Sequence, residues 1–186
     1  MHYDFNKDVL DGEAGEHEFV EMLTRKLSGN PKFTKINASI REKYDWEAVW
    51  PDGNRVTFEF KNDIKSAETG NVAIETWSRG KDSGLNITTA DYFGIKVGTA
   101  GLYIIPVSRL RMMIVAGLQV RKVVGGDRGS NTEMVLFSVR DIEEQAFRID
   151  NRQDGKVRVR SWSSRLSALR ERTRKYPVLT RKYPVL

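Results

Sequence analysis

The chain of 186 residues contains no cysteine, and its only histidines are His2 and His17. The missing thiols exclude a disulfide scaffold, cysteine-liganded zinc or iron–sulfur sites and a thiol nucleophile. Two histidines are too few for a multi-histidine metal centre. No apolar run approaches 18 residues, and the N-terminal segment is polar and acidic, so neither a membrane span nor a signal peptide is expected. We therefore expect a soluble protein of a reducing compartment with no membrane partner.

The positive charge is concentrated at the C-terminal end. Residues 151–186 hold eleven Lys/Arg against two Asp/Glu, a net charge of +9, whereas residues 1–150 hold 20 basic and 23 acidic residues, a net charge of −3. We expect a single domain over residues 1–150, followed by a basic extension over 151–186. Residues 173–186 are TRKYPVL written twice, which is too short for a structural repeat. The asymmetry suggests a polyanionic partner, either nucleic acid or an anionic membrane, and a merely solvated terminus is the alternative.

Hydrophobic periodicity predicts alternating helices and strands. Apolar residues at helical spacing indicate a helix that ends at Gly29-Asn30-Pro31, and a serine cap indicates another that starts at Ser108. The predicted helices cover residues 11–28, 108–118 and 140–149, and the predicted strands cover 32–40, 44–50, 55–61, 71–77, 101–107, 119–124 and 133–139. This order predicts a mixed α/β domain with a central mixed β-sheet flanked by helices.

Residues 50–53, Trp-Pro-Asp-Gly, suit a type I turn followed by a glycine with positive φ. Such a turn forms a three-residue hairpin loop that pairs Trp50 with Asn54. The alternative, a two-residue loop at Asp52-Gly53, shifts the pairing by one residue and mixes apolar with polar side chains on both faces. Apolar matching therefore selects the first register.

In the selected register Asp45 lies opposite Glu59, with the two Cβ atoms about 5 Å apart. Like charges in such a pair destabilise a sheet, and a divalent cation bound by the carboxylate oxygens would offset this repulsion. Lys61 projects from the same face as Glu59, while Phe60 faces the core. The alternative interpretation is an ordinary solvent-exposed face on which charged residues are common.

Asp45, thirteen intervening residues and then Glu59-Phe60-Lys61 resemble the Asp…Glu-x-Lys signature of the PD-(D/E)XK nuclease superfamily. Tyr44 replaces the proline that often precedes the aspartate. The upstream helix is similar to the first-helix glutamate motif of Holliday-junction-resolvase-like members, with Glu16 in the metal-facing position and Glu13 as its competitor.

The segment downstream of the hairpin resembles phage-type members of the superfamily. By this resemblance Glu75, on the next strand, is an additional ligand or orienting group. Ser83, Thr88 and Asp91 then shape the cleft.

The resemblance implies a restriction-endonuclease-like core and a metal-dependent DNA nuclease, most simply an endonuclease acting on branched or phage DNA. Mg²⁺ would be the cofactor, with Mn²⁺ as a substitute, and no small-molecule cofactor is implied. The implied metal ligands are Asp45, Glu59, the Phe60 carbonyl and Glu16, and the implied catalytic residues are Asp45, Glu59, Lys61, Glu16 and Glu75. Lys61 would orient or deprotonate the attacking water, or stabilise the transition-state charge. The resemblance also implies a homodimer, in the cytoplasm of a bacterium or a phage-infected host cell.

Two other functions compete with the nuclease. One is a non-catalytic nucleic-acid-binding module on a decayed nuclease fold, but intact Asp45, Glu59 and Lys61 argue against decay. The other is an adaptor for anionic membranes, but the extension has no clear amphipathic stripe. The basic residues expected to contact DNA are Arg158, Arg160, Arg165, Arg170, Arg172, Arg174 and Lys175.

Overall fold

The computed structural model describes residues 5–27, 29–36, 43–98, 101–126 and 129–149. All of these residues belong to one compact unit, Met1–Asn151. The elements are α1 (Phe5–Lys26), β1 (Lys32–Lys35), β2 (Trp46–Val49), β3 (Arg55–Asp63), α2 (Ser66–Thr69), β4 (Asn71–Ser78), β5 (Lys81–Asp82), the 3₁₀ helix η1 (Gly84–Asn86), β6 (Tyr92–Val97), β7 (Gly101–Pro106), α3 (Val107–Val115), β8 (Arg121–Gly125), β9 (Thr132–Ser138), α4 (Val139–Gln145) and β10 (Phe147–Ile149). None of the described helices is both long and apolar enough to cross a membrane.

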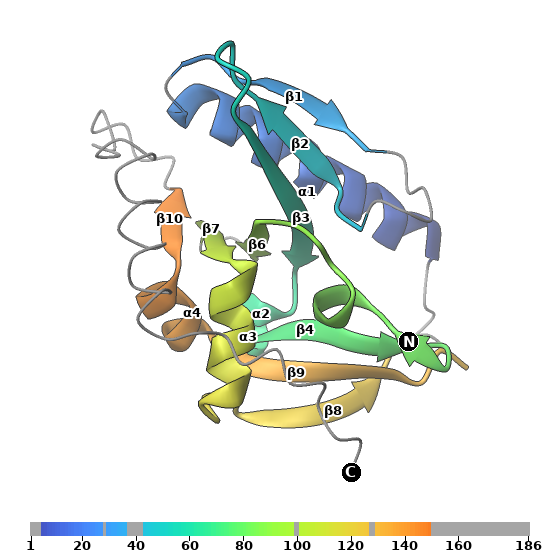
Figure 1. Cartoon of the computed structure of the whole chain (residues 1–186). Helices are drawn as coiled ribbons and strands as arrows, with labels where there is room; N and C mark the ends of the chain where they lie inside the picture. Colours follow the sequence, from blue (N-terminus) through green and yellow to red (C-terminus); the bar gives the residue numbers. More distant parts are fainter. Residues whose placement is uncertain (1–4, 28, 37–42, 99–100, 127–128, 150–186) are drawn as a thin grey trace. The chain divides into compact units, whose positions relative to one another are not determined.

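The strands form two sheets (Figure 1). The six-stranded sheet has the order β1-β2-β3-β6-β7-β10, and within it β3 and β6 run parallel while the other neighbours run antiparallel. The four-stranded sheet has the order β5-β4-β9-β8 and is antiparallel. The predicted class, a mixed α/β domain with a mixed sheet flanked by helices, is confirmed. The second sheet was not predicted.

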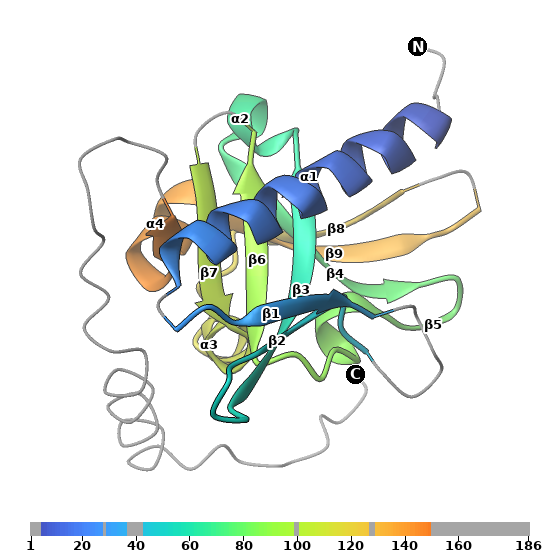
Figure 2. The same cartoon turned by 90° about the horizontal axis from the view of Figure 1, so that it is seen from above.

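Helix α1 lies across one face of the six-stranded sheet (Figure 2). It starts at Phe5, earlier than predicted, and ends at Lys26, three residues before Gly29, which has φ 85°. The fully buried Phe19 ring stacks on Phe60 with a centroid distance of 4.8 Å and meets Phe58 edge-on at 5.8 Å. Gly94 permits this approach, because a Cβ at that position would lie 2.5 Å from Cζ of Phe19.

The main core fills the space on the other side of the six-stranded sheet. There Phe93 and Ile95 of β6 pack with Ile74 of β4, Phe137 of β9 and Leu110 of α3. Each of these five residues is at most 4% exposed. A side chain of β3 that lies on this face is therefore partly screened from water by both sheets, and its charged form is disfavoured there.

The buried carboxylate of Asp63 connects the two sheets. Its Oδ1 accepts a hydrogen bond of 3.1 Å from the backbone N–H of Ser66, and its Oδ2 accepts one of 2.8 Å from the backbone N–H of Ala73. Asp63 ends β3, and Ala73 belongs to β4. One side chain thus fixes the start of the second sheet to the end of the central strand of the first.

The predicted hairpin register is confirmed. Trp46 pairs with Phe58, and Gly53 in the turn has φ 83°. The backbone N–H of Trp50 donates to the carbonyl of Asn54 over 2.8 Å. The local chemistry of the turn is therefore sufficient to set the alignment of β2 with β3.

Two predicted helix boundaries are wrong. The helix expected to be capped by Ser108 begins one residue earlier, at Val107, with Pro106 as its N-cap and no side-chain cap hydrogen bond. The helix expected over 140–149 stops at Gln145, and residues 147–149 form β10 instead. There Phe147 pairs with Ile104 of β7, so pairing with a free sheet edge overrides the local helical pattern.

Candidate functional site

The β2–β3 ladder ends at Trp46, and the chain bends at Asp45. Asp45 donates its backbone N–H to the carbonyl of Phe58 over 2.9 Å. Its carboxylate accepts a hydrogen bond of 2.8 Å from the backbone N–H of Phe60. The predicted ladder pair between Asp45 and Glu59 is therefore absent, because the Asp45 side chain occupies the place of the next backbone partner.

The bend leaves the carbonyl of Phe60 beside the Asp45 carboxylate. In an extended strand the N–H and C=O of one residue point to the same side, and the N–H of Phe60 points toward Asp45. The opposite edge of β3 pairs with β6, where Phe60 aligns with Gly94. Asp45 and the Phe60 carbonyl thus supply two oxygen atoms on one edge of the strand.

Glu59 is half-buried on the other face of β3 from Phe58 and Phe60. Its ladder partner is Phe93, a residue of the main core. The hydroxyl of Thr88 lies 3.1 Å from Oε2 of Glu59 and 2.8 Å from the carbonyl of Lys43. Thr88 was predicted to shape the cleft, and it directly contacts Glu59.

The carboxyl groups of Asp45 and Glu59 are partly buried and repel each other. Burial, and then the charge of Asp45, raise the pKa of Glu59 to about 8, with smaller contributions from Glu16 and Glu75 and an opposing hydrogen bond from Thr88. Burial also raises the pKa of Asp45, against the hydrogen bond from the backbone of Phe60. All four carboxylates chosen from the sequence therefore interact electrostatically around Glu59.

Glu16 reaches this cluster from α1. Its Oε2 accepts a hydrogen bond of 3.3 Å from the indole N–H of Trp46 and lies 2.9 Å from Nζ of Lys35. Lys35, on β1, is a residue that sequence reasoning missed. Its place beside Glu16 depends on how β1 pairs with β2, which no local motif indicates.

Glu75 approaches from β4 in the second sheet. The hydroxyl of Ser83 donates a hydrogen bond to its Oε1. Gly84 follows with φ 47°, and a Cβ there would lie 2.4 Å from the carbonyl oxygen of Glu75. This close approach requires glycine, and it holds Ser83 against the carboxylate.

Lys61 lies two residues beyond Glu59 on the same face of β3 and is half-buried. Its ammonium makes no hydrogen bond or ion pair with any other described residue. Within the described residues it is therefore a cation on the Glu59 face of β3 that is not committed to a structural pair.

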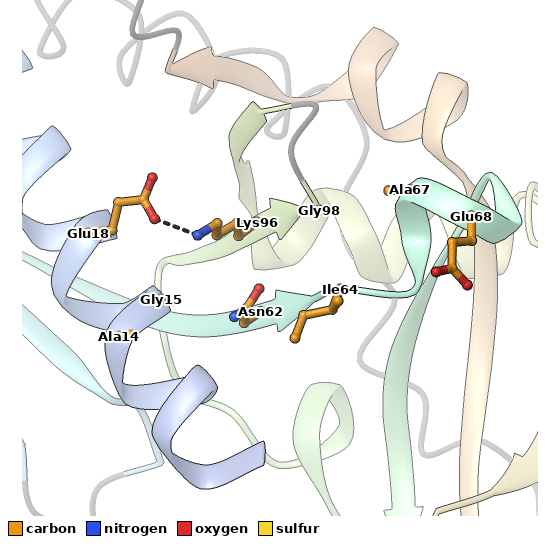
Figure 3. Close-up of a pocket in the computed structure, with 9 residues that line it drawn as sticks. All are labelled: Ala14, Gly15, Glu18, Asn62, Ile64, Ala67, Glu68, Lys96 and Gly98. Carbon is orange, nitrogen blue, oxygen red and sulfur yellow. Dashed lines mark hydrogen bonds and ion pairs between the residues drawn. The ribbon is translucent and has the colours of Figure 1, made fainter. Parts of the chain in front are cut away.

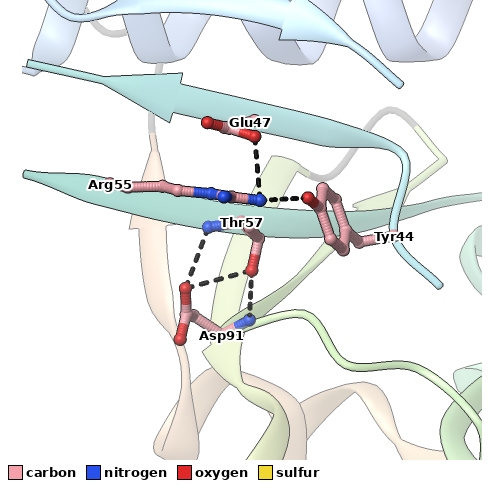
Figure 4. Close-up of polar contacts among 5 residues, drawn as sticks. All are labelled: Tyr44, Glu47, Arg55, Thr57 and Asp91. Carbon is pink, nitrogen blue, oxygen red and sulfur yellow. Dashed lines mark hydrogen bonds and ion pairs between the residues drawn. The ribbon is translucent and has the colours of Figure 1, made fainter. Parts of the chain in front are cut away.

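Asp91 lies just before β6 and contacts β3. Its Oδ2 accepts hydrogen bonds from the backbone N–H and the hydroxyl of Thr57, at 2.9 and 3.0 Å (Figure 4). These bonds join the entry of β6 to β3, and no contact of Asp91 with the four carboxylates is seen among the described residues. In the same view Arg55 pairs with Glu47 at 3.0 Å and donates to the hydroxyl of Tyr44.

Within the described ranges, no three His, Cys, Asp or Glu side chains are grouped closely enough to hold a metal ion. The oxygen atoms of Asp45, Glu59 and the Phe60 carbonyl nevertheless suit a hard divalent cation. The unfavourable negative charge, expressed in the raised pKa of both acids, is what such a cation would relieve. The donor set therefore fits Mg²⁺ through two carboxylates and one backbone oxygen.

A pocket of about 440 Å³ lies elsewhere, between α1 and the ends of β3 and β6 (Figure 3). Its lining includes Gly15, Asn62, Ile64 and the ion pair of Glu18 with Lys96. None of the four carboxylates lines it, so this pocket is separate from the site around Glu59.

The seven basic residues predicted to contact DNA, from Arg158 to Lys175, lie outside the described residues. Comparisons with protein-family models, with curated proteins and with solved structures find no match to the chain. The arrangement of Asp45, Glu59, Lys61, Glu16 and Glu75 is therefore the basis on which a function can be argued.

Proposed function

We propose that the protein is a divalent-metal-dependent DNA nuclease of PD-(D/E)XK type that hydrolyses phosphodiester bonds as an endonuclease. The observation that carries the proposal is the placement of Asp45 and Glu59. Two partly buried carboxylates that repel each other destabilise the folded protein. A bound cation would remove this repulsion, and the free energy released would favour cation binding.

Asp45, Glu59 and the carbonyl of Phe60 would hold Mg²⁺, or Mn²⁺ in its place. When bound, the ion supplies electrostatic stabilisation of the transferring phosphate and lowers the pKa of a bound water. The hydrogen bond from the N–H of Phe60 keeps the Asp45 carboxylate in one orientation. Thr88 does the same for Glu59. Glu16, whose Oε2 is held by two donors, would complete the shell through water.

Lys61 would act on the reacting groups themselves. Its ammonium has no described partner and shares a face with Glu59, so it is available to orient or deprotonate the attacking water or to stabilise negative charge on the phosphate. Glu75, held by Ser83, stands across from β3 on the second sheet and would orient a water on that side.

The choice of DNA as substrate rests on charge and on the resemblance of the motif. The extension 151–186 carries a net +9, which suits a polyanion. Branched DNA, or the DNA of a phage, is the substrate implied by the resemblance to resolvase-like and phage-type nucleases. A homodimer follows from the same resemblance, since a four-way junction offers two cut sites.

The test is cleavage of supercoiled plasmid, linear duplex and a four-way junction with Mg²⁺ or Mn²⁺. We expect cleavage that EDTA abolishes and that Glu59→Gln and Asp45→Asn each remove while DNA affinity is kept. Glu68→Gln, at an exposed carboxylate on α2, is the matched control and should cleave like the wild type. Robust cleavage by purified Glu59→Gln would contradict the assignment. DNA binding by the wild type without cleavage would identify the non-catalytic module instead.

A further inference from the structure

The ammonium of Lys35 is paired with Glu16, the carboxylate of α1 whose charge acts on both Asp45 and Glu59. Its Nζ lies 2.9 Å from Oε2 of Glu16, an oxygen that also accepts the indole N–H of Trp46. We propose that Lys35 is the permanent counter-ion of Glu16, so that the centre binds one divalent cation and not two. This inference rests on the proposed metal-dependent function and defines the stoichiometry of its metal.

The position of Lys35 follows from the pairing of β1 with β2. Lys35 is the last residue of β1 and pairs directly with Trp46 of β2. Trp46 is buried, and the Lys35 ammonium lies 5.9 Å from the centroid of its ring. Because the same indole donates to Glu16, these three side chains form one connected group. Glu16 is thereby committed to two donors on β1 and β2.

Further carboxylates act on Lys35 from the elements packed around it. Glu16 raises the pKa of Lys35 mainly through their hydrogen bond, and the charges of Glu13 and Asp45 raise it further, against the effect of burial. The ammonium thus faces α1 on one side and the bend at Asp45 on the other. A second dication near Glu16 would have to displace it or tolerate its repulsion.

Counting charges leads to the same stoichiometry. The four carboxylates, Asp45, Glu59, Glu16 and Glu75, carry −4 when ionised. The ammonium groups of Lys35 and Lys61 supply +2, and one divalent cation supplies the remaining +2. A second dication would leave an excess of +2 in a partly buried place, where an unbalanced charge is costly.

The experiment counts Mn²⁺ ions on the full-length protein, by isothermal titration calorimetry and by electron paramagnetic resonance of free Mn²⁺. We expect one equivalent for the wild type. Lys35→Met should create a second site, with an affinity raised at least about tenfold over any second binding to the wild type. Lys35→Arg keeps the positive charge and should remain at one equivalent. Lys96→Met breaks the other lysine–glutamate pair on α1, with Glu18, and should also remain at one.

Two equivalents on the wild type, or one on a folded Lys35→Met protein, would overturn the inference. The circular dichroism spectrum and the melting temperature establish that the variant is folded, and Lys35 is exposed enough for the substitution to be tolerated. If the wild type binds two equivalents of Mn²⁺ and also cleaves DNA with Mg²⁺, the proposed nuclease function is kept and only the proposed role of Lys35 is overturned. A wild type that neither binds Mn²⁺ nor cleaves DNA would overturn the proposed function as well.

Discussion

The backbone N–H of Phe60 donates a hydrogen bond of 2.8 Å to the carboxylate of Asp45, 15 residues earlier in the chain. This contact stands where the next backbone bond of the hairpin would form. A side chain has replaced a main-chain acceptor, and as a result an acid and a carbonyl oxygen adjoin each other on the edge of β3. The bend at Asp45 is thus the feature on which the proposed cation site depends.

Glu59→Gln should stabilise the metal-free protein at alkaline pH. The pKa of Glu59 is raised from 4.5 to about 8, so the folded state holds a proton that the unfolded state has released over that range. Wild-type stability therefore falls as pH rises from about 4.5 to 8, and glutamine removes this loss. Calorimetry in EDTA should give the same melting temperature for the wild type and Glu59→Gln at pH 4. At pH 9 the melting temperature of Glu59→Gln should be higher than that of the wild type. Glu68→Gln should match the wild type at both, and an equal shift at both pH values would exclude titration as the cause.

Lys61→Ala should lower the cleavage rate about 10²–10⁴-fold, the usual effect of losing an acid–base or electrostatic group. Its Mn²⁺ affinity should not fall, because a nearby ammonium repels the cation. Single-turnover cleavage and calorimetric titration measure the two quantities separately. Much weaker Mn²⁺ binding by the variant would show that Lys61 organises the site instead of acting on the substrate.

Deletion of residues 151–186 should lower the affinity for DNA. It should also make that affinity less dependent on salt concentration. If about half of the eleven basic residues contact phosphates, the slope of log K against log salt should become shallower by about 4–5. Cleavage at saturating DNA should survive, because all the proposed catalytic residues lie within 1–150. Fluorescence anisotropy on a duplex and a junction across a salt series is the measurement, with a shorter deletion after Arg172 alongside. An unchanged slope in a folded protein would mean that the extension does not bind DNA.

Gly94→Ala should destabilise the fold by about 1–3 kcal/mol, the usual cost of overpacking a core. Its Cβ would lie 2.5 Å from the Phe19 ring, which is itself stacked on Phe60, so α1 would have to move away from the sheet. Urea unfolding gives the free energy. A second substitution, Phe19→Leu, should make the alanine less costly than it is in the wild type, and strictly additive effects would contradict the contact.

Arg79→Gly should stabilise the protein by about 0.5–1 kcal/mol. Arg79 and Gly80 form the two-residue turn between β4 and β5, with φ 51° and 78°, and a left-handed conformation is strained for arginine. For a domain of this size the melting temperature should rise by about 1–4 °C. Arg79→Ala keeps the strain and should show no such gain, so equal gains from both substitutions would point to the lost charge.

Features set by local chemistry could be predicted from the sequence. The turn at 50–53 predicts the pairing of Trp46 with Phe58. Helical periodicity predicts the first helix, and its residue Glu16 does contact Trp46 of the hairpin. The four carboxylates were found because each belongs to a short motif. The other three, Asp45, Glu16 and Glu75, all raise the pKa of Glu59 in the folded protein.

Features set by contacts between distant segments could not be predicted. The sequence of β4 shows that it is a strand, but nothing in it indicates that its partner is β9 and not β3. Lys35 carries no motif, and only the folding of β1 onto β2 brings it to Glu16. Asp91 resembled a cleft residue by its position in the chain, and nothing there indicated its hydrogen bonds to Thr57.

The carboxylate of Asp63 receives one backbone N–H from the start of α2 and one from β4. Glu59 and Glu75 stand on different sheets, and this side chain sets the position of one strand against the other. A partial opening that detaches the four-stranded sheet would therefore remove Glu75 and Ser83 while Asp45 and Phe60 keep their contact. Such openings need less free energy than global unfolding. The proposed nuclease activity would then be lost at a lower denaturant concentration than the hydrogen-exchange protection of the hairpin, and it would return without complete refolding.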